Sequence, residues 1–365
     1  MRRFLFVLEF FPPHIGGVEV LFGELASELA RRGHHVEVIT SADPGEARRE
    51  VRGNLTIRRI AAPAFARRYL FMLMAIPAAI RAARRADLVH TTTYNAAIPA
   101  WIAARLARKP AVITAHEVFG RQWQEMPGMN PILGYAYRAF EALVIRLGWT
   151  HIITDADFTR PRLPDPSRTT TVHAAVDHDF WSSVRHRARS LPGAFNYLYF
   201  GRPGVSKGVE YLLEAAEIVR RERPDSRLVM ILSREPAGQY RRLLPRIKAL
   251  GEHVVLVDSV PRNELPSYLL GADVVVVPSI SEGFGYTAIE AACLGCRVIA
   301  TTGHATEEML GDYATFVPPR DPRALAEAIL NAERTPAPSP LARRFTAAAH
   351  AAAVIDVYRR AGVDV

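Results

Sequence analysis

Residues 274–301 read VVVVPSISEGFGYTAIEAACLGCRVIAT and are the most informative part of the sequence for the fold. Four valines are followed by a loop, a helical stretch and a second short apolar run, which predicts a strand–helix–strand unit of a parallel sheet. In the loop, Gly283, Phe284 and Gly285 bring backbone N–H groups to the helix start, where phosphate binds favourably. Glu282 and Glu290 flank this start and can accept hydrogen bonds from hydroxyl groups. The alternative is that both are solvated glutamates beside an ordinary glycine turn.

The same alternation of short β-branched runs with amphipathic stretches occurs in both halves of the chain, which predicts two parallel α/β sheets. In the first half we expect a helix over 18–32 and strands over 4–8, 35–40, 55–60, 87–91, 111–114, 151–154 and 170–173. In the second half we expect strands over 196–200, 227–232, 253–257, 273–277, 297–300 and 314–317, and helices over 208–221, 240–250, 264–270, 286–294 and 322–332. A substrate is expected in the cleft between two doubly wound sheets, outside the carboxyl ends of their strands.

The length predicts two domains, because 365 residues exceed the ~250–300 at which one hydrophobic core stops growing. We place the N-terminal Rossmann-like domain at 1–185 and the C-terminal one at 186–340, with the polar, Arg-rich stretch 179–192 as a linker. A Pro-rich break at 335–340 precedes an Ala-rich helix over 341–360. We expect residues 341–365 to pack back on the first domain.

The composition excludes several classes of protein. With 49% apolar and 23% charged residues and two cysteines, the chain is not disordered, collagen-like or held by disulfides. The longest uncharged apolar run, 69–80, is shorter than the ~20 residues of a membrane-spanning helix. The apolar start of the chain is interrupted by Glu9 and Pro12, unlike a secretory signal. We therefore expect a cytoplasmic location.

The formal charge of +9 indicates an anionic partner, although genome composition would also explain an Arg-rich chain. Arginine suits bidentate phosphate contacts, which leaves a nucleotide, a phospholipid surface or a nucleic acid as partner. A nucleic-acid-binding protein would cluster its cations on one face with aromatic residues between them. Here the arginines are spread along helices between buried strands, so we expect no nucleic-acid partner.

A second candidate phosphate loop, GRPGVSKG at 201–208, follows the first strand of the second half. Arg202 and Lys207 flank a Gly/Pro turn at another helix start, so both cations can converge where that helix attracts negative charge. The loop lacks the GxxxxGK[ST] pattern of a P-loop. The alternative is an ordinary pair of surface charges.

Two loops of the first half are candidates as well. Gly16 and Gly17 lie between the first strand and the first helix, where glycine lets a ligand approach the helix start closely. His116 follows the strand 111–114 and is expected at the mouth of the cleft. Simple turn chemistry and a structural histidine are the alternatives.

The order GGVE, ITAHE, FGRPGVSKG and PSISEGFGYTAIEA resembles the retaining glycosyltransferases of family 4 (GT4), which have the two-Rossmann GT-B fold. The resemblance runs from Phe4 to about Ala332, and Glu282 with Glu290 matches the family's E-x7-E signature. It implies transfer of a hexose from a UDP-, GDP- or ADP-sugar to an unidentified hydroxyl of a glycan or a lipid-linked acceptor. It implies neither metal nor cofactor, since the nucleotide sugar is a co-substrate. The first domain would then be the acceptor side and the second the donor side.

The resemblance also implies a role for each candidate residue. Arg202 and Lys207 would bind the diphosphate, which needs neutralising as it departs. Glu282 would hold donor-sugar hydroxyls, Glu290 the ribose, and the amides of 283–285 the sugar and phosphate. Gly17 would approach the phosphate from the other domain and His116 would contact the sugar near the reacting carbon. The nucleobase would lie along 259–261, beside Val260.

Three departures and several alternatives stay open. The chain has Ala174-Ala175-Val176-Asp177 where the family often has Asn-Gly before Val-Asp, Arg297 where Pro is common, and His304 where a second Gly is frequent. Other GT-B enzymes, a phosphorylase or a nucleotide-sugar epimerase, are alternatives, although a phosphorylase would need a Schiff-base lysine from only three lysines.

Three short patterns have alternative readings of their own. The triplets 155–157 and 177–179 have the DxD pattern of metal-dependent transferases, and 293–296 is a lone CxxC that we interpret as two buried thiols. The stretch 66–85, apolar and bracketed by arginines, is either a buried crossover helix or a peripheral membrane contact.

Overall fold

The computed structural model describes residues 1–14, 16–63, 67–183, 185–332, 340–341 and 343–365. The chain forms two compact units: unit 1 comprises Met1–Glu125, Met129–Ala175 and Phe345–Val365, and unit 2 comprises Met126–Gly128 and Val176–Arg344. The chain thus passes from unit 1 to unit 2 after Ala175, ten residues before the expected end of the first domain. Most of the Pro-rich stretch 335–340, residue 184 of the expected linker and residue 66 lie outside the described residues.

Unit 1 is built on an eight-stranded sheet with the order β3-β4-β2-β1-β5-β6-β7-β8. The strands are β1 (Arg3–Val7), β2 (His35–Ser41), β3 (Arg49–Arg52), β4 (Leu55–Ile60), β5 (Leu88–Thr92), β6 (Ala111–Ala115), β7 (His151–Thr154) and β8 (Thr169–Thr171). All pairs are parallel except β3 against β4. The polar edge strand β3 was not predicted, because the sequence REVR carries no run of buried apolar residues.

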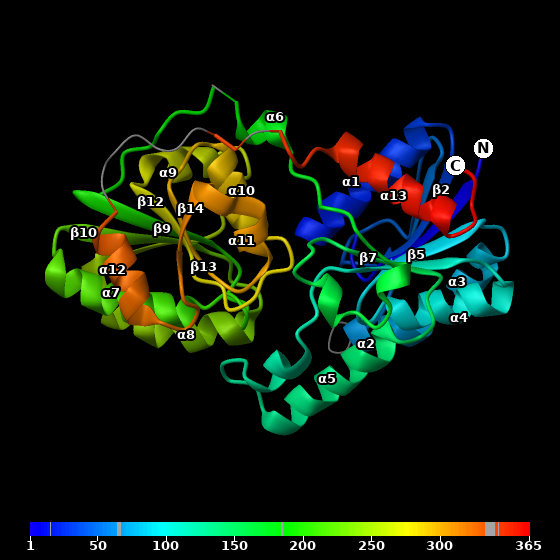
Figure 1. Ribbon diagram of the computed structural model, residues 1–365, viewed down its shortest axis with the longest axis horizontal. Coiled ribbons are helices and arrows are strands. Elements are labelled where there is room, and N and C mark those ends of the chain that lie inside the picture. The colour runs from blue at the N-terminus through cyan, green and yellow to red at the C-terminus, as the bar shows by residue number, and fades with distance from the viewer. Residues whose placement is uncertain (15, 64–66, 184, 333–339, 342) are drawn as a thin grey trace. The chain divides into compact units, whose positions relative to one another are not determined.

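Helices cover both faces of this sheet (Figure 1). One face carries α1 (Gly17–Arg31) and α13 (Ala347–Arg360). The other carries α2 (Arg67–Met74), α3 (Ile76–Ala83), α4 (Ala97–Ala107) and α5 (Pro131–Ile145). The stretch 66–85 therefore forms two helices, with Phe71 fully buried and Leu73 exposed. None of the helices in the described part of the chain is long and apolar enough to cross a bilayer.

The C-terminal helix α13 belongs to the core of unit 1. It begins at Ala347, six residues later than predicted, because Thr346 caps it by accepting a hydrogen bond from the Ala349 N–H at 3.2 Å. Tyr358 is fully buried, and its hydroxyl lies 2.7 Å from His90 Nδ1 on β5. Burial lowers the pKa of His90 to about 3, so this histidine is neutral at physiological pH.

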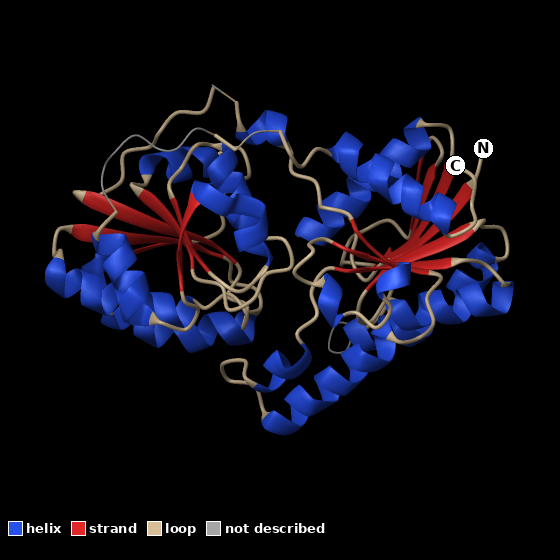
Figure 2. Ribbon diagram, in the orientation of Figure 1, coloured by secondary structure: helices blue, strands red, loops and turns tan. Residues whose placement is uncertain are grey.

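Unit 2 has a six-stranded, wholly parallel sheet with the order β11-β10-β9-β12-β13-β14. Helices lie on both sides of this sheet (Figure 2). The strands are β9 (Phe195–Gly201), β10 (Ser226–Leu232), β11 (Val254–Val257), β12 (Val274–Val277), β13 (Val298–Thr301) and β14 (Ala314–Val317). The helices are α6 (His178–Trp181), α7 (Val209–Glu222), α8 (Ala237–Ala249), α9 (Leu265–Gly271), α10 (Tyr286–Cys293), α11 (Ala305–Leu310) and α12 (Pro322–Leu330). The predicted pair of parallel α/β sheets is confirmed. Strand β9 lies beside β12, so the loops that follow these two strands leave the same edge of the sheet.

Candidate functional site

The two predicted phosphate loops of unit 2 are linked by a backbone hydrogen bond. The carbonyl of Ser206, in the loop after β9, accepts a hydrogen bond from the Ile280 N–H in the loop after β12 at 2.7 Å. Gly208 caps α7 with a φ of +63°, and a Cβ there would lie 1.9 Å from the Pro278 carbonyl oxygen. Only glycine satisfies both the left-handed backbone and this close approach. The loops that precede α7 and α10 are therefore in contact.

Glu282 connects the two loops through its side chain. Its carboxylate is buried and receives the Lys207 ammonium at 2.8 and 2.9 Å and the Ser279 hydroxyl at 2.7 Å. Burial alone would raise the pKa of Glu282, but the charge of Lys207 and the hydrogen bonds from Lys207 and Ser279 outweigh it and lower the pKa below its ordinary value. Glu282 is therefore an ionised acceptor at neutral pH.

The two predicted cations of this site differ in their surroundings. Lys207 is bound to Glu282, whereas the side chain of Arg202 is exposed and makes no hydrogen bond or ion pair with a described residue. The main chain of Arg202 is fixed, since its carbonyl accepts hydrogen bonds from the Tyr199 hydroxyl at 3.1 Å and the Gly204 N–H at 2.8 Å. The guanidinium group is therefore available to an anion.

Sequence reasoning missed the residues that support Glu282 from the side of β13. His304 Nε2 lies 2.7 Å from Thr301 Oγ1, and the Thr301 hydroxyl also donates to the Ser279 carbonyl. Burial lowers the pKa of His304, although Glu282 opposes that shift. Gly285 has a φ of +90°, and a Cβ added at this position would lie only 2.5 Å from Thr306 Oγ1. In the sequence, His304 was notable only because the family often has a glycine at this position. Its contact with Thr301 forms because α11 packs near the loop after β12 in the folded protein.

Glu290 lies on α10 in a different environment. As a residue Glu290 is half-buried, and its carboxyl group makes no hydrogen bond or ion pair with the described residues. Burial raises the pKa of Glu290 to about 8, and the nearby Arg262 only partly opposes this. Arg262 binds Asp177 at 2.9 Å and follows the half-buried Val260 at the end of β11. The Glu290 carboxyl thus has unused hydrogen-bonding capacity.

In unit 1, Gly16 and Gly17 stand at the start of α1. Gly16 is the cap residue, and as a glycine it has no side chain that could accept hydrogen bonds from the first N–H groups of the helix. The Glu19 carboxylate occupies the space that a Cβ on Gly16 would take. An anion that approaches this helix start must therefore displace the Glu19 side chain.

His116, after β6, forms a dyad that the sequence did not predict. Its Nδ1 lies 2.6 Å from Oδ2 of the buried Asp155, which follows β7. A carboxylate in this position orients the ring and leaves Nε2 for a second partner. Nε2 is buried and has no hydrogen-bond partner among the residues that the structure describes.

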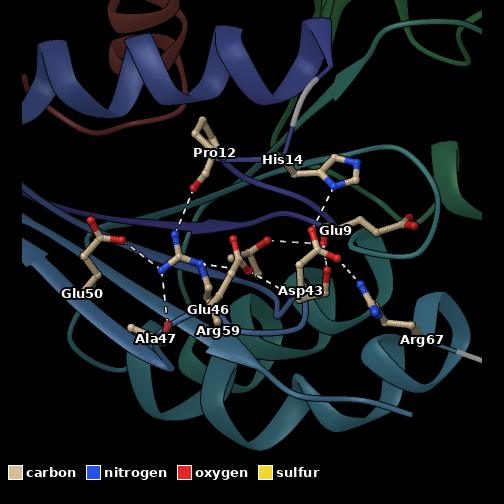
Figure 3. Close-up of polar contacts among 11 residues, drawn as sticks. Glu9, Pro12, His14, Asp43, Glu46, Ala47, Glu50, Arg59 and Arg67 are labelled. Atoms are coloured by element: carbon tan, nitrogen blue, oxygen red, sulfur yellow. Dashed lines mark hydrogen bonds and ion pairs between the residues drawn. The ribbon is translucent and has the colours of Figure 1, made fainter. Parts of the chain in front are cut away.

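A polar network lies at the carboxyl ends of β1 and β2 in the same unit (Figure 3). Asp43 stands between His14, whose Nδ1 is 3.0 Å away, and the guanidinium of Arg67 at the start of α2. The His14 ring stacks on Phe10 with 4.2 Å between ring centroids. Glu9 accepts a hydrogen bond from Asn95 at 2.9 Å and forms an ion pair with Arg68.

Arg59 on β4 ties this network to the rest of the unit. Its buried guanidinium donates to the Pro12 carbonyl and to Glu50, both at 3.0 Å, and lies 3.4 Å from Glu46 (Figure 3). The loop after β1 is therefore anchored to β4 and to the segment that precedes it. This edge of a parallel sheet is where open α/β sheets bind their ligands.

Comparisons with known proteins agree with this geometry. Residues 15–180 match the family described as Glycosyltransferase Family 4, and residues 194–334 match Glycosyl transferases group 1. The chain is a family 4 glycosyltransferase. It is 29% identical over 401 aligned residues to a D-inositol 3-phosphate glycosyltransferase of Kineococcus radiotolerans, covering 96% of this chain and 91% of the relative. The corresponding protein of Mycobacterium avium is 28% identical, covering 95% and 89%.

Solved structures show that this glycosyltransferase has the GT-B architecture. A sucrose-phosphate synthase of Thermosynechococcus elongatus superposes with a TM-score of 0.79 at 20% identity, covering 99% of both chains. The Anabaena protein HepE, solved with UDP and glucose, gives a TM-score of 0.75 at 18% identity, covering 98% of this chain and all of that one.

The aspartates of the two DxD triplets bind side chains or backbone groups of the protein itself, and the two cysteines of the CxxC pattern are buried. In the first DxD triplet, Asp155 binds His116 and Asp157 accepts a hydrogen bond from Thr171 at 2.6 Å. In the second, Asp177 caps α6 and binds Arg262, while Asp179 pairs with Arg343. Cys293 and Cys296 are free and buried, as predicted for the CxxC.

Proposed function

We propose that this glycosyltransferase moves a hexose from a nucleotide-diphosphate sugar to a hydroxyl acceptor, with retention at the anomeric carbon and without a metal ion. The observation that carries the proposal is the pair of glycine-capped helix starts, α7 and α10, joined by Lys207 and Glu282 with Arg202 beside them. Two helix starts and two cations suit a diphosphate. The UDP and UDP-glucose complexes of the Anabaena protein support the same class of donor.

The reaction that we propose needs no protein nucleophile. The bond between the anomeric carbon and the diphosphate oxygen breaks, and its electron pair stays on the nucleoside diphosphate. Arg202, Lys207 and the N–H groups at the helix starts stabilise this charge as it develops. The acceptor oxygen bonds to the anomeric carbon on the face that the diphosphate leaves, and its proton passes to a phosphate oxygen. The products are the glycoside and the protonated nucleoside diphosphate.

The remaining contacts follow from the chemistry of each group. The ammonium of Lys207 carries three N–H donors, so it can reach a phosphate oxygen while it stays beside Glu282. Glu282 then accepts hydrogen bonds from the donor sugar and Glu290 from the ribose, while Val260 lies beside the base. His116 would contact the sugar through its unpartnered Nε2.

Unit 1 would bind the acceptor at the loops after β1 and β2. His14, Arg67 and Arg68 offer ring and guanidinium N–H groups there, which suits an acceptor rich in oxygen atoms. The curated relatives are named for transfer to an inositol phosphate, which supports a polyol or glycan hydroxyl as the acceptor.

Thermal unfolding with UDP, GDP and ADP and their glucose derivatives tests the donor site. One nucleotide at 100 times its dissociation constant should add ~2.7 kcal/mol of stability. Arg202→Ala and Lys207→Ala should lose most of that gain, whereas Lys248→Ala, which removes an exposed lysine of α8, should keep it. Because Lys207→Ala leaves Glu282 buried without its cation, Arg202→Ala is the variant that keeps the folded state intact. A full nucleotide response in both site variants would contradict the proposal.

The course of the reaction needs two further measurements. Turnover should persist in excess EDTA, and the coupling constant of the product's anomeric proton should match that of the donor sugar. His116→Ala should keep the nucleotide-induced stabilisation and lose turnover, which separates its role from donor binding. An inverted product, or activity that returns only with a divalent cation, would refute retention or metal independence.

A further inference from the structure

Helix α5 has the polarity opposite to that of an ordinary surface helix. Five residues on one side of the helix, at spacings of three or four except for the adjacent pair 135–136, form what we call its outer stripe: Ile132, Tyr135, Ala136, Ala139 and Leu143. All five are exposed, Ile132 to 81% and Leu143 to 54%, and none is charged. A surface helix normally turns its charged residues outward and its apolar ones to the core.

The inner face of α5 holds the helix in this rotation. Glu141 is buried and accepts hydrogen bonds from the Tyr94 hydroxyl and the Trp123 indole, both at 3.1 Å. It also accepts the backbone N–H groups of 119–120 at 3.0 and 2.7 Å. A Cβ on Gly134 would lie 2.8 Å from the Trp123 carbonyl, so the backbone of α5 contacts its neighbour closely there. Turning the outer stripe inward would break all of these contacts.

Helix α2 lies beside α5 and has exposed apolar residues of its own. The hydroxyl groups of Tyr69 on α2 and Tyr137 on α5 are 3.2 Å apart, so the two helices are neighbours. Tyr69, Leu73 and Met74 are exposed, whereas Phe71 on the same helix is fully buried. We use the name docking face for the outer stripe together with Tyr69, Leu73 and Met74.

A cationic cavity adjoins the outer stripe. It measures about 380 Å³ and is lined by the arginines Arg121, Arg138, Arg146 and Arg162. The one carboxylate in its wall, Glu141, already accepts four hydrogen bonds. Arg146 lies three residues after Leu143, so the cavity and the stripe meet along α5. Four guanidinium groups beside an apolar surface suit phosphate groups.

The charge of unit 1 is unequal between the two faces of its sheet. The helices α2, α3, α4 and α5 of one face contain five arginines and one acidic residue, the buried Glu141. The helices α1 and α13 of the opposite face contain four acidic residues and three arginines. Each Arg near an anionic membrane adds to the electrostatic attraction. Of these two layers of helices, the α2–α5 layer is the one with an excess of positive charge, which a negatively charged surface attracts.

We propose that the docking face binds the surface of a bilayer that contains anionic phospholipid. Its apolar side chains enter the interfacial layer, the exposed tyrosines lie at the level of the headgroups, and the arginines of the cavity bind lipid phosphates. A second copy of the chain fits less well, since a two-fold interface through this face would set arginines against arginines. The proposal goes beyond the transfer reaction and does not depend on it.

Co-sedimentation of the full chain with phosphatidylcholine vesicles, with and without phosphatidylglycerol, tests this. We expect binding that requires phosphatidylglycerol and weakens with salt. Ile132→Asp with Leu143→Asp should lower the partition coefficient at least tenfold, because two apolar anchors are lost. Arg121→Glu with Arg146→Glu should also lower it more than tenfold. All four side chains are exposed or line an open cavity, so folding should be retained.

Matched controls lie elsewhere on the molecule. Val20→Asp changes an exposed apolar residue on α1, and Arg220→Glu with Arg221→Glu changes two arginines of α7; neither should alter vesicle binding. Nucleotide-induced stabilisation should be unchanged in every variant, so failure here is distinct from failure of the transfer proposal. Two results would overturn the proposal: no binding to phosphatidylglycerol vesicles at low salt, or a wild-type dimer that the Ile132/Leu143 variant abolishes.

Discussion

Glu282 and Glu290 belong to one signature but titrate in opposite directions. Lys207 and Ser279 bind Glu282 and lower its pKa, whereas burial without a bound cation raises the pKa of Glu290 to about 8. Two carboxylates in contrasting environments take different roles. One is a fixed anion that can hold sugar hydroxyls, and the other is neutral at pH 7 until a ligand or a rise in pH removes its proton.

Glu290 should make the stability of the enzyme depend on pH. Its pKa rises from 4.5 in the unfolded chain to about 8 on folding, so between these values the folded state holds a proton that the unfolded state has released. Stability should therefore fall as pH rises through this window, by up to about 1.4 kcal/mol per pH unit, and show no such effect below it. Urea unfolding of wild type and Glu290→Gln from pH 5 to pH 8 measures the difference.

The Gln variant should have the flatter pH profile and be the more stable form at pH 8. Glu222→Gln, on an exposed carboxylate at the end of α7, is the matched control and should follow wild type. Parallel profiles for wild type and Glu290→Gln would contradict the assigned environment of this carboxyl group.

At the scale of elements, the loops after β9 and β12 depend on Gly208. An alanine there would combine a φ of +63° with a 1.9 Å approach to the Pro278 carbonyl. Gly251 has nearly the same φ, +57°, but a Cβ on it would meet nothing within 4 Å. Gly251→Ala should cost ~1–2 kcal/mol of stability through the backbone alone, and Gly208→Ala should cost clearly more and reduce nucleotide-induced stabilisation. Equal losses in the two variants, measured by urea unfolding, would show that the two loops do not need this contact.

The sequence predicted those elements whose pattern is local. The strands 55–60, 151–154 and 314–317 have the predicted ends, because each is a short run rich in β-branched residues and bounded by turns. Helix α5 was not predicted, because its apolar residues lie on all sides of the helix and a glutamate lies on its buried side. The sequence therefore lacks the apolar repeat of 3.6 residues that indicates an amphipathic helix. The loops around Glu282 and Lys207 were visible as glycine and charge patterns. The supporting His304 and the Asp155 beside His116 were not, because each contact joins segments that meet only in the folded sheet.

At the scale of the whole molecule, the two units have separate hydrophobic cores, and each contains a buried tyrosine–histidine hydrogen bond. In unit 1 the Tyr358 hydroxyl lies 2.7 Å from His90 Nδ1, and in unit 2 the Tyr197 hydroxyl lies 2.7 Å from His253 Nε2. Burial lowers the pKa of both histidines, to about 3 and about 4, so both pairs are neutral. They form a matched pair of probes, one in each core.

Calorimetry of two variants should resolve unfolding of the units. Tyr358→Phe and Tyr197→Phe each leave a buried ring nitrogen unpaired, at a cost of about 1–3 kcal/mol. For a unit of this size each kcal/mol shifts the midpoint by roughly 2–4 °C. Tyr358→Phe should lower one transition and Tyr197→Phe the other, and the nucleotide should raise only the transition that Tyr197→Phe lowers. A single transition that both variants lower equally would mean that the two cores unfold as one, and the donor site would then be stabilised by the whole chain rather than by unit 2.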